Sequence, residues 1–235
     1  MNSTIIIALA LGMRHGTDPD HLTAIDGLSR IRPCAANGFL FALGHGVVVT
    51  MLAVGIGGMI SNRLAFLGPW VLILIGAVNL WRMFRPAPHS HRRPIIEQPF
   101  LLGMLLAAGF ETASQFAALI LTNRLNPWVV GAAFTSGMVI VDGLDGYLAA
   151  STQRLAMAGN SNAAGASRLL GLLVVLFSFG LGAAELLDFD LDRIALPTGL
   201  VLFAAVIAIR IWARQKVPLL TGNLNVQMAE VVIAK

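Results

Sequence analysis

The sequence predicts an all-α integral membrane protein with about seven transmembrane helices, and three observations support this fold class. Of the 235 residues, 57% are hydrophobic and 12% are charged, whereas about 25% of the residues in an average soluble domain are charged. Apolar segments recur that are long enough to cross about 30 Å of hydrocarbon at 1.5 Å per residue. Short connections with Arg, Gly, Pro or Asn separate these segments. Composition and patterning therefore exclude a soluble domain.

The apolar segments follow one another along the whole chain. We predict spans at residues 3–28, 36–60, 66–84, 100–121, 127–150, 169–187 and 194–212. The first span is unusual, because its uninterrupted apolar stretch covers only residues 5–13 and charged residues follow directly. Such a segment can lie at membrane depth only when other helices surround it.

Basic residues are concentrated in alternate connections, and this predicts the orientation of the chain. The connections after the first, third, fifth and seventh spans carry at least two basic residues each. Those after the second, fourth and sixth spans carry one each, namely Arg63, Arg124 and Arg193. The positive-inside rule therefore places the N-terminus outside and the C-terminus in the cytoplasm, for a chain in the cytoplasmic (inner) membrane.

A short internal similarity predicts an inverted repeat. Residues 12–15 of the first span resemble residues 109–112 of the fourth, and residues 43–46 of the second resemble the Gly-Met pair at 137–138 of the fifth. Copies separated by three spans have opposite orientations, as in many secondary transporters that bind substrate at the repeat interface. We predict one membrane domain with these parts: repeat one at 3–85, a cytoplasmic loop at 86–98, repeat two at 99–188, a last helix at 194–212 and a tail at 213–235.

The strongest functional signal is a His-x4-Asp-His box at residues 15–21. It places two imidazoles and two carboxylates inside a membrane span, where ionisable groups are costly and usually mark a functional pathway. Pro19 lacks an N–H group, so the carbonyl of His15 loses its usual helical partner, and Gly16 weakens the same turn. The predicted break lets His15 and His21 point at one cation, although they would not share a face of an unbroken helix.

The donor types at this box predict a borderline divalent metal. Imidazole nitrogen with carboxylate oxygen suits nickel, cobalt, zinc or copper(II), whereas calcium and magnesium prefer oxygen alone. In the second span, Gly44 and Gly46 flank His45 and allow another helix to approach closely. The predicted metal ligands are His15, Asp20, His21 and His45. The alternative is a buried polar network in which Arg14 pairs with Asp18 and the histidines are only hydrogen-bonded.

Further polar residues lie in the fourth and fifth spans. Glu111 and Gln115 share a helix face at i, i+4, and Asp142 and Asp145 share one at i, i+3. Their expected role is to relay the cation or protons, and the alternative is to neutralise a buried arginine. The residues expected to relay the metal or to support its ligands are Asp18, Arg14, Glu111, Thr112, Gln115, Asp142 and Asp145.

Other polar residues are given no role in the metal site. Asp26 and Glu185 lie near span ends, where contact with solvent or lipid headgroups is expected. His89 and His91 lie in the predicted cytoplasmic loop. The default expectation is an ordinary basic loop that does not bind metal. The single cysteine, Cys34, excludes sites built on paired cysteines. The sequence has no Gly-rich loop followed by Lys, so the chain is not expected to use ATP itself.

Taken together, these motifs resemble the signatures of the nickel/cobalt transporter (NiCoT) permeases. The matching segments are the box at 15–21, Leu43-Gly44-His45, residues 109–113, and Gly137-Met138 followed by 142–146. The resemblance covers over half of the chain and implies a single-chain carrier, not an enzyme, for uptake of nickel, cobalt or both. It implies that His15, Asp20 and His21 are needed for transport and that His45 takes part in metal selection.

The sequence departs from the family pattern at several points. The usual span ahead of the His box is not seen, so we expect a short member of the family. The fourth-helix pattern usually has Asp and a final Glu where Glu111 and Gln115 stand, and the fifth-helix pattern usually has Thr where Gly143 stands. These departures leave affinity, metal preference and direction of transport open.

Three other functions remain to be weighed against uptake. Metal efflux is the nearest, because related exporters share the architecture. A membrane acyltransferase is more distant and rests on His15-x4-Asp20 alone. The third is a metal-binding subunit of a partner ATPase. The expected partners are the metal ion, the lipid bilayer and, downstream, a metallochaperone or the maturation of a nickel or cobalt enzyme. Nucleic acid is not expected, and no cofactor is expected besides the transported Ni²⁺ or Co²⁺.

Overall fold

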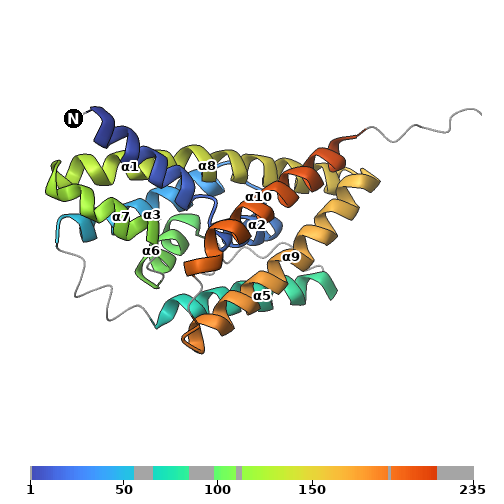
Figure 1. The fold of residues 1–235 in the computed structure, drawn as a ribbon. Coiled ribbons are helices and arrows are strands. Elements are labelled where there is room, and N and C mark those ends of the chain that lie inside the picture. The colour runs from blue at the N-terminus through green and yellow to red at the C-terminus, as the bar shows by residue number, and fades with distance from the viewer. Residues whose placement is uncertain (1, 56–65, 85–97, 110–112, 190–191, 216–235) are drawn as a thin grey trace, which may run out of the picture.

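The computed structural model describes residues 2–55, 66–84, 98–109, 113–189 and 192–215, and these residues form helices without any strand (Figure 1). In chain order the helices are α1 (Asn2–His15), α2 (Pro19–Ile31), α3 (Asn37–Ala53), α5 (Leu67–Phe84), α6 (Pro99–Gly109), α7 (Ala113–Ile120), the 3-10 helix η2 (Leu121–Asn123), α8 (Pro127–Met157), α9 (Ser161–Leu186) and α10 (Asp192–Arg214). The predicted all-α fold class is confirmed.

The long apolar helices identify a membrane protein. Four segments are long and apolar enough to cross a bilayer: Leu67–Phe84, Pro127–Met157, Ser161–Leu186 and Leu196–Arg214. Ser3–His15, Asn37–Ala53 and Pro99–Ala108 are shorter apolar helices. Each of the seven predicted spans coincides with at least one helix. Large apolar side chains on the outer surface, such as Leu176 and Val201, are exposed, as expected where lipid is the solvent.

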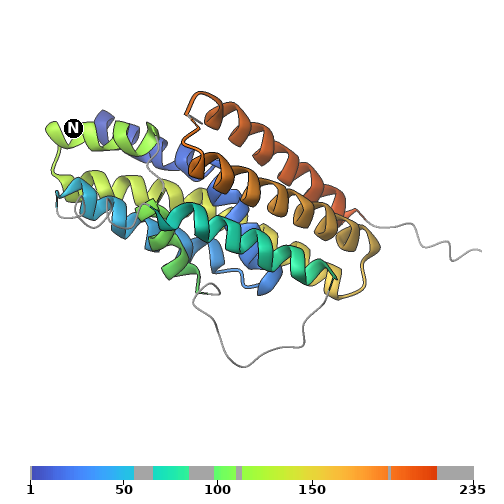
Figure 2. The same cartoon turned by 90° about the horizontal axis from the view of Figure 1, so that it is seen from below.

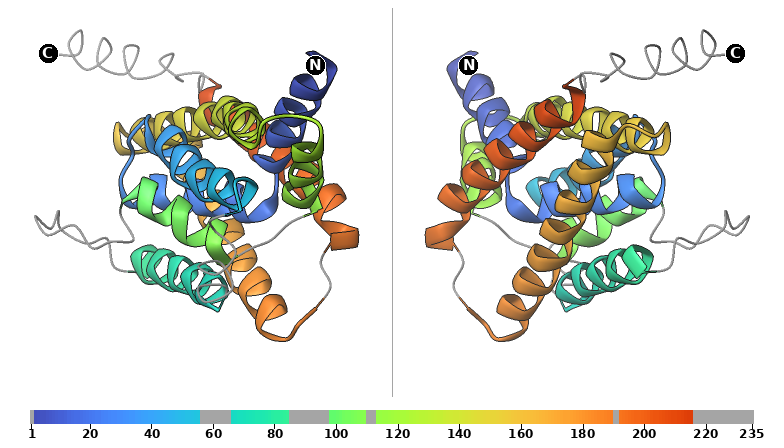
Figure 3. Two further views of the ribbon diagram at one scale, coloured as in Figure 1. Left: turned by 90° about the vertical axis from the view of Figure 1, so that its left-hand side faces the viewer. Right: turned by 90° about the vertical axis from the view of Figure 1, so that its right-hand side faces the viewer.

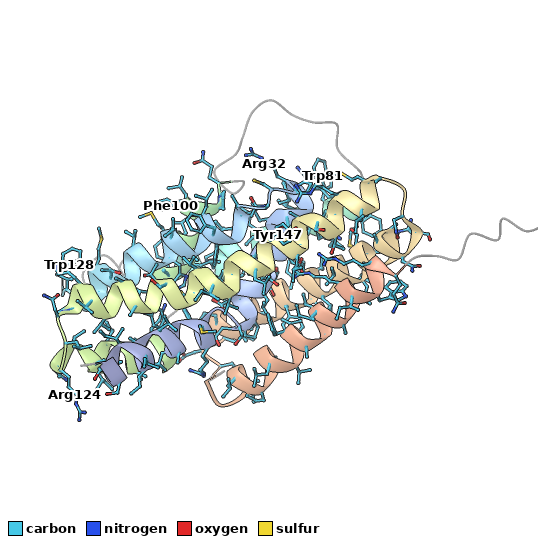
Figure 4. All side chains as sticks on the ribbon, turned by 90° about the horizontal axis from the view of Figure 1, so that it is seen from above. Arg32, Trp81, Phe100, Arg124, Trp128 and Tyr147 are labelled. Atoms are coloured by element: carbon cyan, nitrogen blue, oxygen red, sulfur yellow. The ribbon has the colours of Figure 1, made fainter. Side chains whose placement is uncertain are left out.

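Two tryptophans and two arginines lie toward the two ends of the bundle. Trp128 and Arg124 lie near the beginning of α8, and Arg32 and Trp81 lie toward the other end of the molecule (Figure 4). Trp128 and Trp81 are both more than half exposed. Tryptophan is enriched at both membrane interfaces, and charged arginines lie in the connections between spans. This distribution is consistent with a bilayer normal that runs roughly along α8.

The first predicted span is broken where the sequence indicates. α1 ends at His15 and α2 begins at Pro19. Asp18 donates its backbone N–H to the carbonyl of His15 at 2.9 Å, so a tighter turn satisfies the carbonyl that loses its α-helical partner to the proline. The expected loss of a partner for this carbonyl is therefore compensated within the chain.

α2 is polar, yet it lies in the middle of the bundle. It is in contact with α8, α9, α5 and α10, and all of its residues except Arg30 and Ile31 are buried. Its apolar side chains Ile25 and Leu28 join a core cluster with Leu72 of α5. This enclosure by other helices explains how a segment with several charged groups can lie at membrane depth.

α3 and α8 pack closely against each other, and α1 and α6 pack on them. α8 packs along α1 and α3, while α3 also packs along α6. A methyl group at Gly12 or Gly137 would collide with the backbone of the facing helix, and the same holds for Gly44 and Gly103. In the predicted repeat, the first span corresponds to the fourth and the second to the fifth. The contact between α1 and α8 then corresponds to the contact between α6 and α3. This relation accords with the predicted inverted repeat, which stays a prediction.

The helices α5, α9 and α10 pack next to one another in the bundle. α5 packs against α9, and α9 runs beside α10 (Figure 2). α1 and α5 lie on opposite sides of the bundle (Figure 3). Several predicted features lie outside the described residues: His89 and His91 with nearly all of the loop 86–98, Glu111, Thr112 and nearly all of the tail 213–235.

Candidate metal site

Three histidines from three different helices meet in the interior of the bundle. His15, His21 and His45 are each 0% exposed. The ring centroid of His21 lies 4.5 Å from those of His15 and His45, and the latter two are 4.9 Å apart. One potential ligand nitrogen from each ring lies within 4.8 Å of the others. The two histidines of the box and the histidine of the second span therefore converge on one point.

The broken helix brings the first two rings together. His15 is the last residue of α1, and His21 lies in the first turn of α2. Between them, Gly16 is packed against α8, where a Cβ would lie 3.0 Å from Oδ1 of Asp142. The absence of a side chain at this position lets the carboxylate of α8 approach the histidines.

Glycines on both sides of His45 place α3 tightly between its neighbours. A Cβ at Gly44 would meet the backbone carbonyl of Phe100 in α6, and one at Gly46 would meet the side chain of Thr135 in α8. The sequence-based expectation of close helix approach at both glycines is thus confirmed. His45 is held at a fixed depth between α6 and α8, facing α1 and α2.

Two carboxylates orient two of the imidazoles. Nδ1 of His15 lies 2.8 Å from Oδ2 of Asp18, and Nδ1 of His21 lies 3.0 Å from Oδ2 of Asp142. When Nδ1–H donates to a carboxylate, Nε2 carries the lone pair, which is the usual arrangement behind a metal-binding histidine. Nε2 of His21 has no hydrogen-bond partner among the described residues. A buried nitrogen in that condition is costly unless a ligand completes it.

The remaining residues of the box take different positions. Asp20, predicted as a ligand, is buried in the first turn of α2 but does not belong to the group of three histidines. Its Oδ2 has no hydrogen-bond partner within the described chain. Asp18 bonds to His15, and its other oxygen is likewise unpaired. Arg14 is half-buried at the end of α1, and the partner described for the Asp18 carboxylate is His15 and not Arg14.

Gln115 of α7 reaches two of the three histidines. Its side-chain amide nitrogen lies 2.9 Å from Nε2 of His45 and 3.3 Å from Nε2 of His15. The side chain is 3% exposed. The polar stripe predicted in the fourth span therefore touches the histidine cluster through Gln115.

A second buried charged group lies one helical turn further along α8. Arg210 of α10 donates to Oδ1 of Asp145 at 2.6 Å and to Oδ1 of Asp26 at 2.8 Å. Arg210 is 2% exposed, and the two carboxylates are buried as well. Asp145 thus neutralises a buried arginine, which was the alternative to a relay. Because α10 covers Asp26, the expectation that this residue faces solvent or headgroups was wrong.

Sequence reasoning missed Arg210, although a signal for it exists. An arginine inside an apolar span is costly and needs an anionic partner within the bundle. That rule, applied to the last predicted span, would have required a buried acid elsewhere. It would not have identified Asp26 and Asp145, which lie 184 and 65 positions away in the sequence.

Comparisons with known proteins agree with these features. The family model "High-affinity nickel-transport protein" matches residues 1–66, which contain all three histidines. Hydrogenase nickel incorporation protein HupN of Bradyrhizobium diazoefficiens is 28% identical over 256 residues, covering 81% of this chain and 66% of that protein. The high-affinity nickel transport protein of Cupriavidus necator is 31% identical over 206 residues, covering 62% of this chain and 58% of that protein.

A shorter match concerns a different metal. The cobalt transport protein NhlF of Rhodococcus rhodochrous is 44% identical over 54 residues, which cover 20% of this chain and 15% of that protein. The chain spans less than two thirds of the length of these relatives. No solved structure matches the chain. The family model and several nickel transport proteins thus agree that the chain is similar to high-affinity nickel transporters.

Proposed function

We propose that the chain is a secondary-type permease that carries nickel inward across the cytoplasmic membrane, with cobalt as a second cargo. The observation that carries this proposal is the convergence of three buried imidazoles from α1, α2 and α3. The names of the relatives, which are nickel and cobalt transport proteins, support it. Imidazole is a favourable donor for nickel and other borderline metals.

Binding requires that the hydrated cation exchange water for protein ligands. His15, His21 and His45 supply neutral nitrogen donors, and the carboxylates of Asp18 and Asp142 bond to two of the rings from behind. These negative charges compensate a divalent cation in a region from which solvent is excluded. Asp20, in the first turn of α2, serves in this proposal as a ligand of the entering or leaving ion.

Release follows α8 in the same proposal. Asp142 faces the histidines, and Asp145 lies one turn further on, with Asp26 opposite it. Arg210 occupies the space between Asp26 and Asp145 as a tethered cation. A leaving metal ion would pass these carboxylates by competing with the guanidinium, in line with the transport role that intramembrane charges usually have.

The acyltransferase alternative receives no support from the geometry. A His-x4-Asp general base requires that Asp orient the histidine. Here Nδ1 of His15 bonds to Asp18, three residues away, and not to Asp20. Two of the related proteins are named for high-affinity nickel transport and for hydrogenase nickel incorporation. We therefore propose a carrier whose nickel is consumed by the maturation of a nickel enzyme.

Uptake of radioactive nickel by cells that express the chain tests the proposal. Expression should raise accumulation, and His45→Ala should return it to the background of cells without the chain. Accumulation that falls on expression would instead indicate efflux. Uptake into vesicles that contain only the purified chain would exclude a need for an ATPase partner. Thr152→Ala is a control, because among the described residues this buried hydroxyl bonds only to the carbonyl of Leu148 within its own helix.

A further inference from the structure

We infer that Gln115 is a fourth ligand of the transported cation and that its amide sets the preference among metals. The inference rests on the proposed function of the histidine cluster and adds a residue to it. Gln115 reaches the cluster from α7 and is buried with the rings. No other amide side chain is described in contact with the three histidines.

The distances at Gln115 match those between neighbouring ligands of one metal ion. The Nε2 atoms of His15 and His45 lie 3.0 Å apart, and the amide end of Gln115 lies 2.9 Å and 3.3 Å from them. Two donors at about 2.1 Å from a metal ion are separated by about 3.0 Å at a right angle and by about 3.4 Å at the tetrahedral angle. The amide end therefore occupies the third corner of a ligand triangle whose other corners are imidazoles.

The side-chain amide of Gln115 can bond to its neighbours both when the cation is absent and when it is bound. A primary amide carries a donor nitrogen and an acceptor oxygen, and a half turn of its end group exchanges the two. Without metal, the N–H groups of Gln115 can donate to an imidazole nitrogen that has a lone pair. With metal, the oxygen can coordinate from nearly the same position. The side chain thus keeps the imidazoles in place before the ion arrives.

A neutral oxygen donor beside three nitrogens favours nickel over zinc. Three histidines with one water already complete the tetrahedral arrangement that zinc adopts. Nickel(II) favours square-planar or tetragonal sites with nitrogen and oxygen donors. An additional protein oxygen should therefore strengthen nickel binding more than zinc binding. Loss of the amide should therefore weaken nickel binding more than zinc binding.

Calorimetric titration of the purified full chain in detergent with NiCl₂ and with ZnCl₂ tests this inference. Gln115→Leu should raise the Kd for nickel about tenfold or more, with a smaller change for zinc. Gln115→Glu keeps an oxygen and adds a charge, so nickel should bind about tenfold more tightly than to the wild type. The visible spectrum of bound Co²⁺ should also change in Gln115→Leu, because a ligand is lost.

Gln153→Leu is the matched control. Gln153 is a buried glutamine of α8 that bonds to Ser167, and it lies eleven residues from Asp142, or about 16 Å along the helix. Its substitution should leave the Kd for nickel unchanged. Nickel binding to Gln115→Leu that equals or exceeds wild type would overturn the inference and leave the proposed function standing. If Gln115→Leu does not fold, weaker nickel binding by Gln115→Glu would overturn it. A wild-type chain that binds no nickel would overturn both.

Discussion

Nδ1 of His21 and Oδ2 of Asp142 lie 3.0 Å apart, and this contact joins α2 to α8 beside the metal site. Both side chains are 0% exposed. The two residues are 121 positions apart in the sequence, so the bond forms only when the second half of the chain has packed onto the first. The binding geometry of the first half thus depends on a carboxylate from the second.

Asp142→Asn should weaken nickel binding about tenfold to a hundredfold, because the His21 ring loses the anionic acceptor that fixes its tautomer. Titration calorimetry on the purified chain measures the change. Asp188→Asn is the control, since Asp188 is exposed and has a φ of 56°, which asparagine also tolerates. Equal affinities for wild type and Asp142→Asn would show that this carboxylate does not support the ligand.

Nickel affinity should fall as the pH is lowered from neutral to acidic values. The ligand form of imidazole is neutral, so protons compete with the cation, and stronger competition at lower pH raises the Kd. Calorimetry in two buffers with different ionisation enthalpies would also detect protons released on binding. A Kd that stays constant from neutral to acidic pH would argue against imidazole ligands.

Arg210→Leu should destabilise the protein by about 3–5 kcal/mol, because it leaves the buried carboxylates of Asp26 and Asp145 without their cation. Thermal unfolding in detergent measures this loss. A triple variant that also carries Asp26→Asn and Asp145→Asn should recover much of the stability, since no unpaired charge remains. Arg214→Leu, at an exposed arginine one turn away, should have little effect. An Arg210→Leu protein as stable as wild type would contradict the ion-pair assignment.

Gly44→Ala should lower the stability by about 1–3 kcal/mol and also weaken nickel binding, because its methyl group would press against the backbone of α6 beside His45. Gly143→Ala is the opposite case on α8. A Cβ there meets nothing within 4 Å, so this variant should be neutral or more stable by about 0.5–1 kcal/mol. Thermal unfolding and nickel titration of both variants provide the comparison. Equal effects at the two positions would show that helix approach at Gly44 is not tight.

Local sequence rules were sufficient for the fold class, for the helix break beside His15 and for the close packing around His45. Pro19 and Gly16 predict the break that separates α1 from α2, and the glycines around His45 predict its close packing. These features depend on backbone chemistry within a few residues. They can therefore be recognised without knowledge of the tertiary structure.

The pairing of the carboxylates could not be predicted in the same way. Asp18, rather than Asp20, bonds to His15 because the tight turn at 16–18 brings its carboxylate to Nδ1 of the ring. Asp26 meets Arg210 only because α10 returns across α2. Several acidic residues lie at similar distances along the sequence from each histidine or arginine, and each of them could form the bond. The packing of distant helices decides between them.

The three residues between α1 and α2 have a mechanical consequence. His15 belongs to a helix that packs on α7 and α8, whereas His21 belongs to one enclosed by α5, α8, α9 and α10. A small tilt of α1 about this joint would pull one donor away from the other two without breaking a hydrogen bond inside either helix. The joint that brings the ligands together is thus also a place where His15 can move relative to His21 and His45.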